Sequence, residues 1–545
     1  MWKMKSYKWL AGLCVGLAAT ACSNFLEENP RDSLPEEEAY DSLAELYRNG
    51  VASLYNNIGG NADSQGLQGT GRGIYDLNTF TTDEAIMPTR GGDWYDGGFW
   101  QGLYLHRWGV SSDAIHDTWE YLYKVVSRCN HSLERIRAYE QKHTGSSVEV
   151  YRAEVRALRA MYYYYLMDLF GRVPLVTSTT MAPEGLSQTE RGEVFRFVVN
   201  ELQAVLPLLA AERSNVPGTY YGRLTQPVAC FLLAKLALNA EVYADDDWTD
   251  GIRPDGHSLM FTVEGRELDA WQTVQYYCGK LADMGYRLED DYTANFAIFN
   301  ESSAENIFTI PMSKTLYANQ FIYLFRSRHY NHAKAYGLGG ENGASATPEV
   351  LDVFGYGTPE VDPRFDWCYF YDDVRDLNGN PVYLDDGTQL VYLPREVALD
   401  VSGLSCEQTA GARMKKYEVD PGAFKDGKLI DNDIVLFRYA DVLLMQSEAK
   451  VRSGADGTAE LNAVRARAGA APRTATLETL LEERQLELAW EGWRRQDLIR
   501  FGQFTRTYSF RPMVEGEESG FTTVFPLPDK VLKMNPRMKQ NPGYK

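Results

Sequence analysis

A glycine-rich loop at residues 90–100 concentrates side chains suited to binding a polar ligand. Glycine lets the backbone bend sharply, so aromatic side chains between glycines can be exposed. Such rings stack on the apolar faces of sugars, whose hydroxyls need fork-like donors and carboxylate acceptors. The loop offers both kinds of group: Trp94, Tyr95, Trp100, Arg90, Asp93 and Asp96. We predict a glycan-binding surface here, and support of the fold is the alternative role for the same loop.

The C-terminal charge cluster suggests a different chemistry. Glu487 and Glu491 are four residues apart on one face of an expected helix. Two carboxylates at that spacing could serve as the acid and base of a glycosidase. Residues 483–497 mix both signs, however, so these charges can also pair locally or with Arg438 and Glu448. We favour packing ion pairs and predict no catalytic residue and no enzymatic activity.

Metal-binding patterns are weak. His329 and His332 are a close pair, but no Glu or third His follows at metal-ligand spacing. Acidic loops at residues 245–250 and 372–379 could hold calcium with carboxylate oxygens, although neither keeps the twelve-residue EF-hand spacing. We predict solvated turns at both loops and no metal or cofactor site, with bound calcium as the remaining alternative. The sequence also lacks the G-x-S-x-G, P-loop and dinucleotide fingerprints.

Charge and composition limit the partners. The formal net charge of the 545-residue chain is −20, so it repels phosphate backbones and nucleic acid is a poor partner. Aromatic residues reach 13%, with 35 Tyr and 11 Trp. These rings either fill a core or form flat surfaces that stack on ligands.

The N-terminus predicts export. Three lysines precede an apolar stretch, and small residues come directly before Cys22. This order describes an export signal rather than a membrane-spanning helix, which needs about 20 apolar residues. The small residues before Cys22 resemble the lipobox of bacterial lipoproteins, and the segment that follows resembles the surface-export tether of Bacteroides-type lipoproteins. The resemblance implies a signal peptide at residues 1–21 and lipidation of Cys22.

Helical periodicity dominates the rest of the chain. Apolar residues recur at spacings of three and four in segments near residues 43–58, 115–136, 155–169, 190–211, 226–243, 268–284, 433–453 and 477–502. A capping-box pattern at Ser33 and Glu36 precedes the first segment. Helices in the first 290 residues come in pairs, which suits a tetratricopeptide-like solenoid. We predict a mainly α fold with irregular loops at residues 60–110 and 311–430 and a few short β-hairpins.

A series of motifs, in order along the chain, resembles the RagB/SusD family of nutrient-uptake outer-membrane lipoproteins. The N-terminal half contains Thr82-Asp-Glu and a Phe-Gly-Arg-Val-Pro stretch that ends at Pro174. The C-terminal third contains Phe437-Arg-Tyr-Ala-Asp, Glu-Gly-Trp-Arg-Arg from Glu491, and an Asn-Pro-Arg-Met-Lys-Gln-Asn-Pro-Gly-Tyr close that ends at Tyr544. The resemblance covers essentially the whole mature chain.

The resemblance implies four tetratricopeptide-like units as a scaffold and a less regular part that supplies the ligand surface. It also implies a partner, a SusC-type TonB-dependent barrel. The starch-binding prototype uses aromatic residues from two loops, and the later loop corresponds to residues 314–323. The further candidates are Tyr317, Asn319, Tyr323, Arg72 and Tyr75. No Trp occurs between residues 272 and 366, where the prototype has a stacking ring, so a helical amylose-like ligand is not implied.

We therefore expect a non-catalytic, lipid-anchored protein on the outer surface of the outer membrane. It would capture oligosaccharides or polysaccharides and deliver them to the SusC-type transporter. Expected regions are the signal peptide at 1–21, a helical region at 22–310 and a C-terminal region at 311–545 packed with it as one body. The alternatives are a peptide-binding lid of a peptide importer and, less favoured, a surface glycoside hydrolase.

Overall fold

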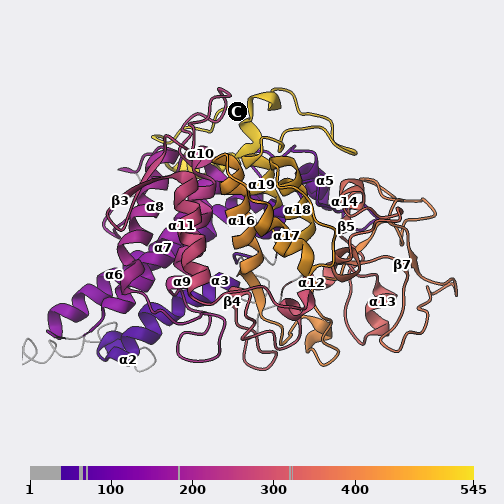
Figure 1. Ribbon diagram of the computed structural model, residues 1–545, viewed down its shortest axis with the longest axis horizontal. Helices are drawn as coiled ribbons and strands as arrows, with labels where there is room; N and C mark the ends of the chain where they lie inside the picture. The colour runs from indigo at the N-terminus through magenta and orange to yellow at the C-terminus, as the bar shows by residue number, and fades with distance from the viewer. Residues whose placement is uncertain are drawn as a thin grey trace, which may run out of the picture.

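The computed structural model describes residues 38–60, 66–68, 71–145, 147–181, 185–317, 321 and 323–545. The expected signal peptide, Cys22 and the capping-box pair Ser33 and Glu36 lie outside these residues. Helices are the predominant regular structure, as predicted, and Figure 1 shows them at the left and centre of the view. Loops and short elements near α13, α14, β5 and β7 form the right-hand side.

The helices of the first half are α2 (Leu43–Glu45), α3 (Ser53–Gly59), α4 (Ile74–Thr79), α5 (Phe99–Tyr104), α6 (Asp113–Lys142), α7 (Glu149–Phe170), α8 (Arg191–Val205), α9 (Gln226–Leu238), α10 (Ala240–Tyr243) and α11 (Ala270–Asp283). Those of the second half are α12 (Tyr323–Arg326), α13 (Tyr330–Ala335), α14 (Pro348–Val353), α15 (Arg364–Cys368), α16 (Tyr439–Arg452), α17 (Thr458–Arg467), α18 (Leu477–Leu488), α19 (Arg494–Arg500) and α20 (Asp529–Met534).

The long helices pack in series. Helix α6 contacts α7, α7 contacts α8, α9 contacts α11, and α11 contacts α16, which also packs on α17 and α18. This chain of neighbours is the arrangement of a helical solenoid, in which each helix buries its apolar face against the next. Helix α9 is buried from Pro227 to Leu238 and is apolar on every side except at Lys235, whose amine pairs with Asp441 of α16. A helix of that composition needs cover on every side, which α8, α11 and α16 help to supply.

Local signals set several helix ends. The first helix begins after Ser42, whose side chain forms a capping box with Glu45. A π-helical segment, Leu46–Ala52, separates α2 from α3 within the predicted 43–58 stretch. Helix α7 ends at Gly171, which has φ +67°. A Cβ at Gly171 would lie 2.6 Å from the Trp248 ring, so glycine is required there for both backbone and space.

Two predicted helices differ from the structure. The 433–453 stretch begins as strand β10 (Ile434–Arg438) and becomes helical only at Tyr439, because a fully buried apolar run has no periodicity that separates strand from helix. The 477–502 stretch breaks into α18 and α19. Trp490 has φ +63° at the break, and its backbone N–H donates to the Glu84 carboxyl group at 2.6 Å. Tertiary contact therefore overrides helical propensity at this point.

Short antiparallel strand pairs join the elements. Strands β2 (Met260–Val263) and β3 (Arg266–Asp269) form a hairpin. The other pairs join more distant segments: β1 (Ala85–Ile86) with β5 (Ser345–Ala346), β4 (Asn306–Ile310) with β10, β6 (Tyr369–Phe370) with β9 (Arg413–Met414), and β7 (Asp372–Asp373) with β8 (Val391–Tyr392). The β1–β5 pair joins the two irregular stretches to each other, and the β4–β10 pair brings the segments at either end of the second stretch together.

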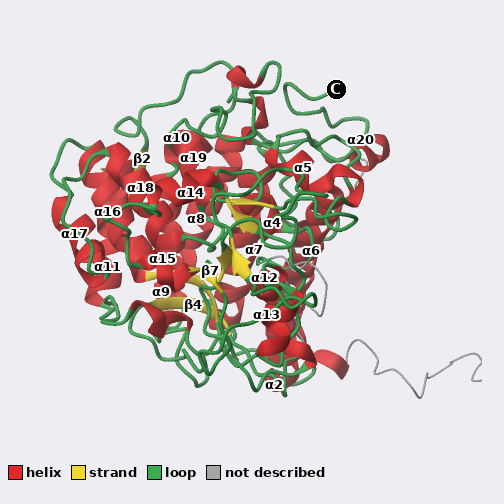
Figure 2. Ribbon diagram, turned by 90° about the vertical axis from the view of Figure 1, so that its right-hand side faces the viewer, coloured by secondary structure: helices red, strands yellow, loops and turns green. Residues whose placement is uncertain are grey.

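One large apolar core runs from Leu46 to Met538 and includes four consecutive buried tyrosines of α7, residues 162–165. Figure 2 shows loops around α12, α13 and β7 facing the viewer, with α11, α16 and α17 at the left. Within the described residues, none of the helices combines the length and the apolar character needed to cross a lipid bilayer.

Candidate functional site

The loop at residues 90–100 has an unusual backbone. Trp94 has φ +62° and Asp96 has φ +43°, a left-handed conformation that residues with a side chain rarely adopt. Gly97 and Gly98 follow with φ +67° and +84°. A Cβ at either glycine would have open space, so the backbone angle rather than crowding calls for glycine. Strain of this kind is often stored at functional sites.

The loop brings Asp96 against Arg72, two of the predicted site residues. The Arg72 Nη2 and Asp96 Oδ2 atoms are 2.9 Å apart, and both side chains are partly exposed. The Arg72 guanidinium also lies over the Phe99 ring, 4.8 Å from its centroid. Asp96 is fixed from below because it accepts the Trp100 indole N–H at 2.7 Å. A planar cation, a carboxylate and a half-buried ring are therefore held side by side.

This cluster borders an open hollow of about 450 Å³, which we call the Arg72 hollow. Its opposite wall comes from the end of α5 and the start of α6. The polar and aromatic residues of the hollow are Arg72, Asp96, Phe99, Arg107, Trp108, Ser111, Ser112, Asp113 and Asp117. Donors of fixed geometry, carboxylate acceptors and aromatic rings thus line one concave surface, as a small-molecule site requires.

Arg90 does not reach this surface. Its side chain is buried, and its guanidinium donates to the Glu407 carbonyl at 2.7 Å, to the Ala410 carbonyl at 2.9 Å and to the Ser345 hydroxyl at 2.9 Å. Burial lowers the pKa of Arg90 well below its ordinary value. The side chain ties the loop to the segments beneath it, so its expected place on the ligand surface does not fit the structure.

Trp100 and Tyr75 are also below the surface. Trp100 is 3% exposed and packs edge-on against Phe80. Tyr75 is 2% exposed and donates to the Trp490 carbonyl at 3.1 Å. The sequence expectation that both contact ligand is corrected by this burial, because each ring is enclosed by the core that supports the loop.

Two further aromatic residues of the loop, Trp94 and Tyr95, do not line the Arg72 hollow. Tyr95 is 58% exposed, whereas Trp94 is half-buried and donates to the Glu341 carbonyl at 3.0 Å. Asp93 accepts the Tyr330 hydroxyl at 3.1 Å, which links the loop to α13.

Asn331, next to Tyr330, donates to the Tyr383 carbonyl at 2.8 Å. Tyr330 and Tyr383 are themselves 46% and 53% exposed. We call the three exposed rings of Tyr95, Tyr330 and Tyr383, whose segments these hydrogen bonds join, the tyrosine face.

The later predicted loop is only partly described. Tyr317 is half-buried and donates to the Gly60 carbonyl at 3.1 Å, which places it beside the end of α3. Asn319 and the side chain of Tyr323 lie outside the described residues. The expectation that these residues join the binding surface stays a prediction.

The charge cluster near Glu487 forms buried ion pairs, as predicted. The Glu487 carboxylate binds Arg438 at 2.5 Å and Arg364 at 3.0 Å, and it also pairs with Arg467. Burial alone would raise the pKa of Glu487, but the three guanidiniums outweigh it and hold that pKa well below its usual range. Glu491 binds Arg438 at 2.7 Å. Carboxylates so enclosed have no open side for a glycosidic bond.

Both candidate histidines make protein contacts. His329 pairs with the Gln408 side chain at 2.8 Å, and His332 pairs with the Tyr392 hydroxyl at 3.0 Å. Burial lowers the pKa of His332 to about 3. These rings are therefore engaged as neutral packing groups.

Carboxylates in the two acidic loops cap turns. Asp247 accepts the Thr249 N–H at 3.2 Å, and Asp376 accepts the Asn380 N–H at 2.8 Å. Among the residues that the structure describes, the group of His, Asp and Glu side chains close enough to share an ion is instead His116, Asp117 and Glu120 on α6. Neither acidic loop forms such a group there.

Sequence reasoning missed three exposed or half-buried rings at these surfaces. Phe99 lies inside the recognised glycine-rich loop, and the glycines before it were the available signal. Tyr330 and Tyr383 come from segments that meet the loop only in the folded chain. Without knowledge of these long-range contacts, nothing distinguishes them from other tyrosines.

The chain matches two family models. Residues 304–544 match the model described as "SusD family", and residues 24–238 match the one described as "Starch-binding associating with outer membrane". A SusD-like protein P38 from Formosa agariphila is 31% identical over 554 residues, covering 96% of each chain. The starch-binding protein SusD of Bacteroides thetaiotaomicron is 24% identical over 591 residues, again covering 96% of each.

Solved structures agree in fold. A laminarin-binding SusD-like protein superposes with a TM-score of 0.67 and 22% identity, covering 93% of this chain and 100% of that one. The surface glycan-binding protein A from Bacteroides thetaiotaomicron has a TM-score of 0.70 and 19% identity, covering 92% and 99%. On the strength of the family models, the 31% identical relative and the shared helical architecture, the chain belongs to the SusD family.

Proposed function

We propose that this protein is a non-catalytic glycan receptor of the cell surface. It captures oligosaccharides in the Arg72 hollow and delivers them to a SusC-type TonB-dependent transporter. The observation that carries the proposal is the grouping of Arg72, Asp96 and Phe99 at the edge of a concave surface of about 450 Å³. Relatives whose printed names describe starch, laminarin or glycan binding support the ligand class.

The three groups match the chemistry of a sugar ring. The Arg72 guanidinium presents fixed N–H donors, and Asp96 presents acceptor oxygens for hydroxyl groups. Phe99 presents an apolar surface on which C–H groups of the ring can pack. Because Trp100 fixes Asp96 and the left-handed loop fixes Phe99, little conformational entropy is lost on binding.

The buried, arginine-bound carboxylate of Glu487 supports the non-catalytic part of the proposal. A glycosidase needs two carboxyl groups facing the scissile bond, one of them with a raised pKa. Glu487 is buried and bound by three arginines, which together outweigh the effect of burial and lower the pKa of its carboxyl group. It therefore fits a structural role and not that of a general acid.

Anchoring and transport complete the proposal. The basic, apolar and small-residue order before Cys22 supports lipidation at that cysteine and a position on the outer membrane. The family description that mentions the outer membrane supports the same location. The SusC-type partner is inferred from the family, and co-purification of a barrel protein with the lipidated chain is the direct check.

Affinity electrophoresis of the mature chain, from Ser23 onward, in gels containing laminarin, starch or other polysaccharides tests the ligand class. We expect retardation by at least one glycan and a loss of affinity of about tenfold or more in Arg72→Ala, because a charge-assisted hydrogen bond is removed. Phe99→Ala removes the stacking surface and should weaken binding less, by about threefold to tenfold.

The matched control is Arg395→Ala, which removes an exposed arginine paired with Asp352 of α14, outside the lining of the Arg72 hollow, and should bind as wild type does. Retardation that is unchanged in Arg72→Ala but lost in Tyr95→Ala would move the site to the tyrosine face. A chain that no glycan retards, and that binds peptides instead, would replace the glycan receptor with the peptide-importer alternative. Release of new reducing ends from a bound glycan would contradict the non-catalytic assignment.

A further inference from the structure

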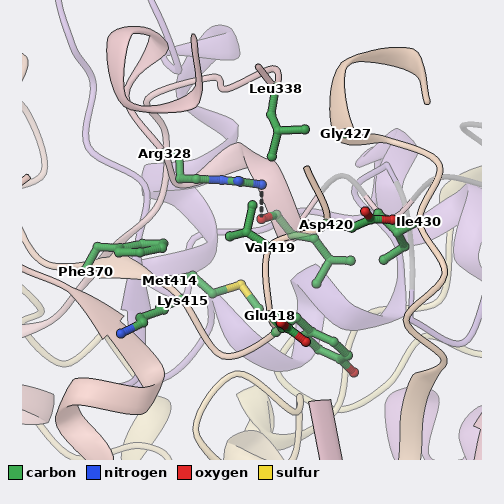
Figure 3. A pocket seen from close by; sticks show the side chains of 12 residues that line it. Arg328, Leu338, Phe370, Met414, Lys415, Glu418, Val419, Asp420, Gly427 and Ile430 are labelled. Carbon is green, nitrogen blue, oxygen red and sulfur yellow. Dashed lines mark hydrogen bonds between the residues drawn. The ribbon is translucent and has the colours of Figure 1, made fainter. Parts of the chain in front are cut away.

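A small cavity lies between α12, α13 and the loop at residues 414–430, and the Arg328 side chain enters it. Figure 3 shows the guanidinium among the lining residues, with Leu338 above it, Val419 below it and Phe370 to the left. The cavity has a volume of about 30 Å³. That is more than the roughly 10–15 Å³ that one water-sized sphere occupies, so the space can hold a small ion.

Arg328 is buried without a charged partner. Its side chain is 5% exposed, and its Nη2 atom donates to the Leu324 carbonyl at 3.2 Å. Its Nη1 atom is buried and has no hydrogen-bond partner. Within the described part of the chain, no carboxylate forms an ion pair with this guanidinium. Burying a charge in this way is costly unless an opposite charge and hydrogen bonds compensate it.

The acidic residues that line the cavity are engaged elsewhere. Glu418 accepts the Ile298 N–H at 2.8 Å. Asp420 accepts the Gly422 N–H at 2.8 Å and lies 3.4 Å from the Lys314 amine. Figure 3 shows both carboxylates across the cavity from the Arg328 head group. They therefore leave the guanidinium uncompensated.

The remaining walls suit a weakly hydrated anion. Leu338, Phe370, Val419 and Ile430 supply apolar contacts, whereas the Lys415 amine points away from the Arg328 head group and donates to the Asp366 carbonyl at 2.7 Å. Burial lowers the pKa of Arg328 to about 10, so the guanidinium stays charged at neutral pH. A water molecule could accept the free Nη1–H but could not neutralise this charge.

We propose that the cavity is a binding site for a monovalent inorganic anion of halide size, held by Arg328, with chloride as the physiological occupant. The anion supplies the charge compensation that the protein lacks there. It also steadies the segment between α12 and α13, which leads directly into Tyr330, the first residue of α13. This site is separate from the Arg72 hollow and does not depend on the glycan proposal.

Crystals of the mature protein grown in sodium bromide test the site directly, because bromide scatters anomalously. We expect an anomalous peak within hydrogen-bond distance of Arg328 Nη1. A water molecule, or no density, at that position in wild-type crystals would overturn the proposal.

Thermal unfolding gives a second readout. At equal ionic strength, sodium chloride should raise the melting temperature of the wild type above that in sodium gluconate by about 1–2 °C. Arg328→Gln should lose this difference, whereas Arg395→Gln, which alters an exposed arginine, should keep it. An equal chloride effect in all three proteins would contradict a site at Arg328. If Arg328→Gln does not fold, the bromide crystals of the wild type decide alone.

Discussion

Two regions of the molecule bury arginines in opposite ways. In the C-terminal region, buried arginines face carboxylates, and the Arg438 guanidinium binds Glu305, Glu487 and Glu491 together. In the irregular region, Arg90 and Arg413 donate to backbone carbonyls instead. Arg438 and Arg413 are 1% and 0% exposed, so their comparison separates the effect of the hydrogen-bond partner from that of burial.

The partner decides the electrostatic outcome. Burial opposes the charge on Arg438, but its three carboxylates outweigh this and raise its pKa well above the ordinary value. Among the described residues no carboxylate pairs with Arg413, and burial lowers its pKa to about 10. In the C-terminal region, the buried arginines and carboxylates thus neutralise one another. The loop region retains positive charge under its surface, which favours acceptor-rich ligands and anions.

The largest expected effect comes from removing one partner of the paired region. Arg438→Met leaves three buried carboxylates without their shared cation and should lower the free energy of unfolding by about 3–5 kcal/mol. Chemical denaturation measures this loss. Arg395→Met, at an exposed pair, should stay within about 1 kcal/mol of wild type. A loss below about 1 kcal/mol in Arg438→Met would show that the ion pairs do not hold the scaffold.

A second prediction concerns two neighbouring buried carboxyl groups, one of which is paired with arginines while the other is bonded to a backbone N–H. Burial would raise the pKa of Asp83, but Arg494 and Arg506 outweigh it and hold that pKa below its usual range. Burial raises the pKa of Glu84 to about 7, because its hydrogen bond from the Trp490 N–H compensates only part of the cost.

Since the folded chain binds the Glu84 proton more tightly than the unfolded chain, the free energy of unfolding falls as pH rises from about 4.5 to about 7. Glu84→Gln removes this dependence. At pH 8 the variant should be more stable than wild type by about 2–3 kcal/mol, and at pH 4.5 the two should be equal. Denaturation of both proteins across this range gives the difference; a constant difference would rule out titration of Glu84.

Arg413→Met should cost less than Arg438→Met, although both side chains are buried. It removes the hydrogen bonds that Arg413 donates to the carbonyls of Ser327, Gly343 and Gln408, of which Gly343 keeps a donor in Arg90, and it strands no charge, so we expect a loss of about 1–2 kcal/mol. The same denaturation series compares the two variants. Equal losses would remove the distinction between charge-paired and carbonyl-paired arginines.

Tyr95→Ala should have the smallest effect on stability. The ring is 58% exposed, so its removal should change the free energy of unfolding by less than about 0.5 kcal/mol. Any change in glycan affinity would then report on the surface and not on folding. A clear loss of stability would indicate that the ring packs on the loop beneath it.

Much of the scaffold could be predicted because its signals are local. The spacing of Ile115, Trp119 and Leu122 places α6, and the mixed charges near Glu487 predict ion pairs. The site was harder, because the loop residues look equivalent in sequence. Arg90 and Arg72 are both arginines near glycines, yet one is enclosed by residues 345–410 and the other faces the hollow. That difference depends on long-range pairing such as Ala85 with Ala346, which no local pattern reveals.

Helix α9 has a consequence for how the chain must be made. It is buried on all sides, and part of its cover is α16, which lies about two hundred residues further along the chain. Until residues 439–452 are synthesised and in place, the part of α9 that α16 covers remains open to water, and Lys235 of α9 lacks its carboxylate partner Asp441. Fragments that stop before α16 are therefore expected to expose apolar surface and to aggregate.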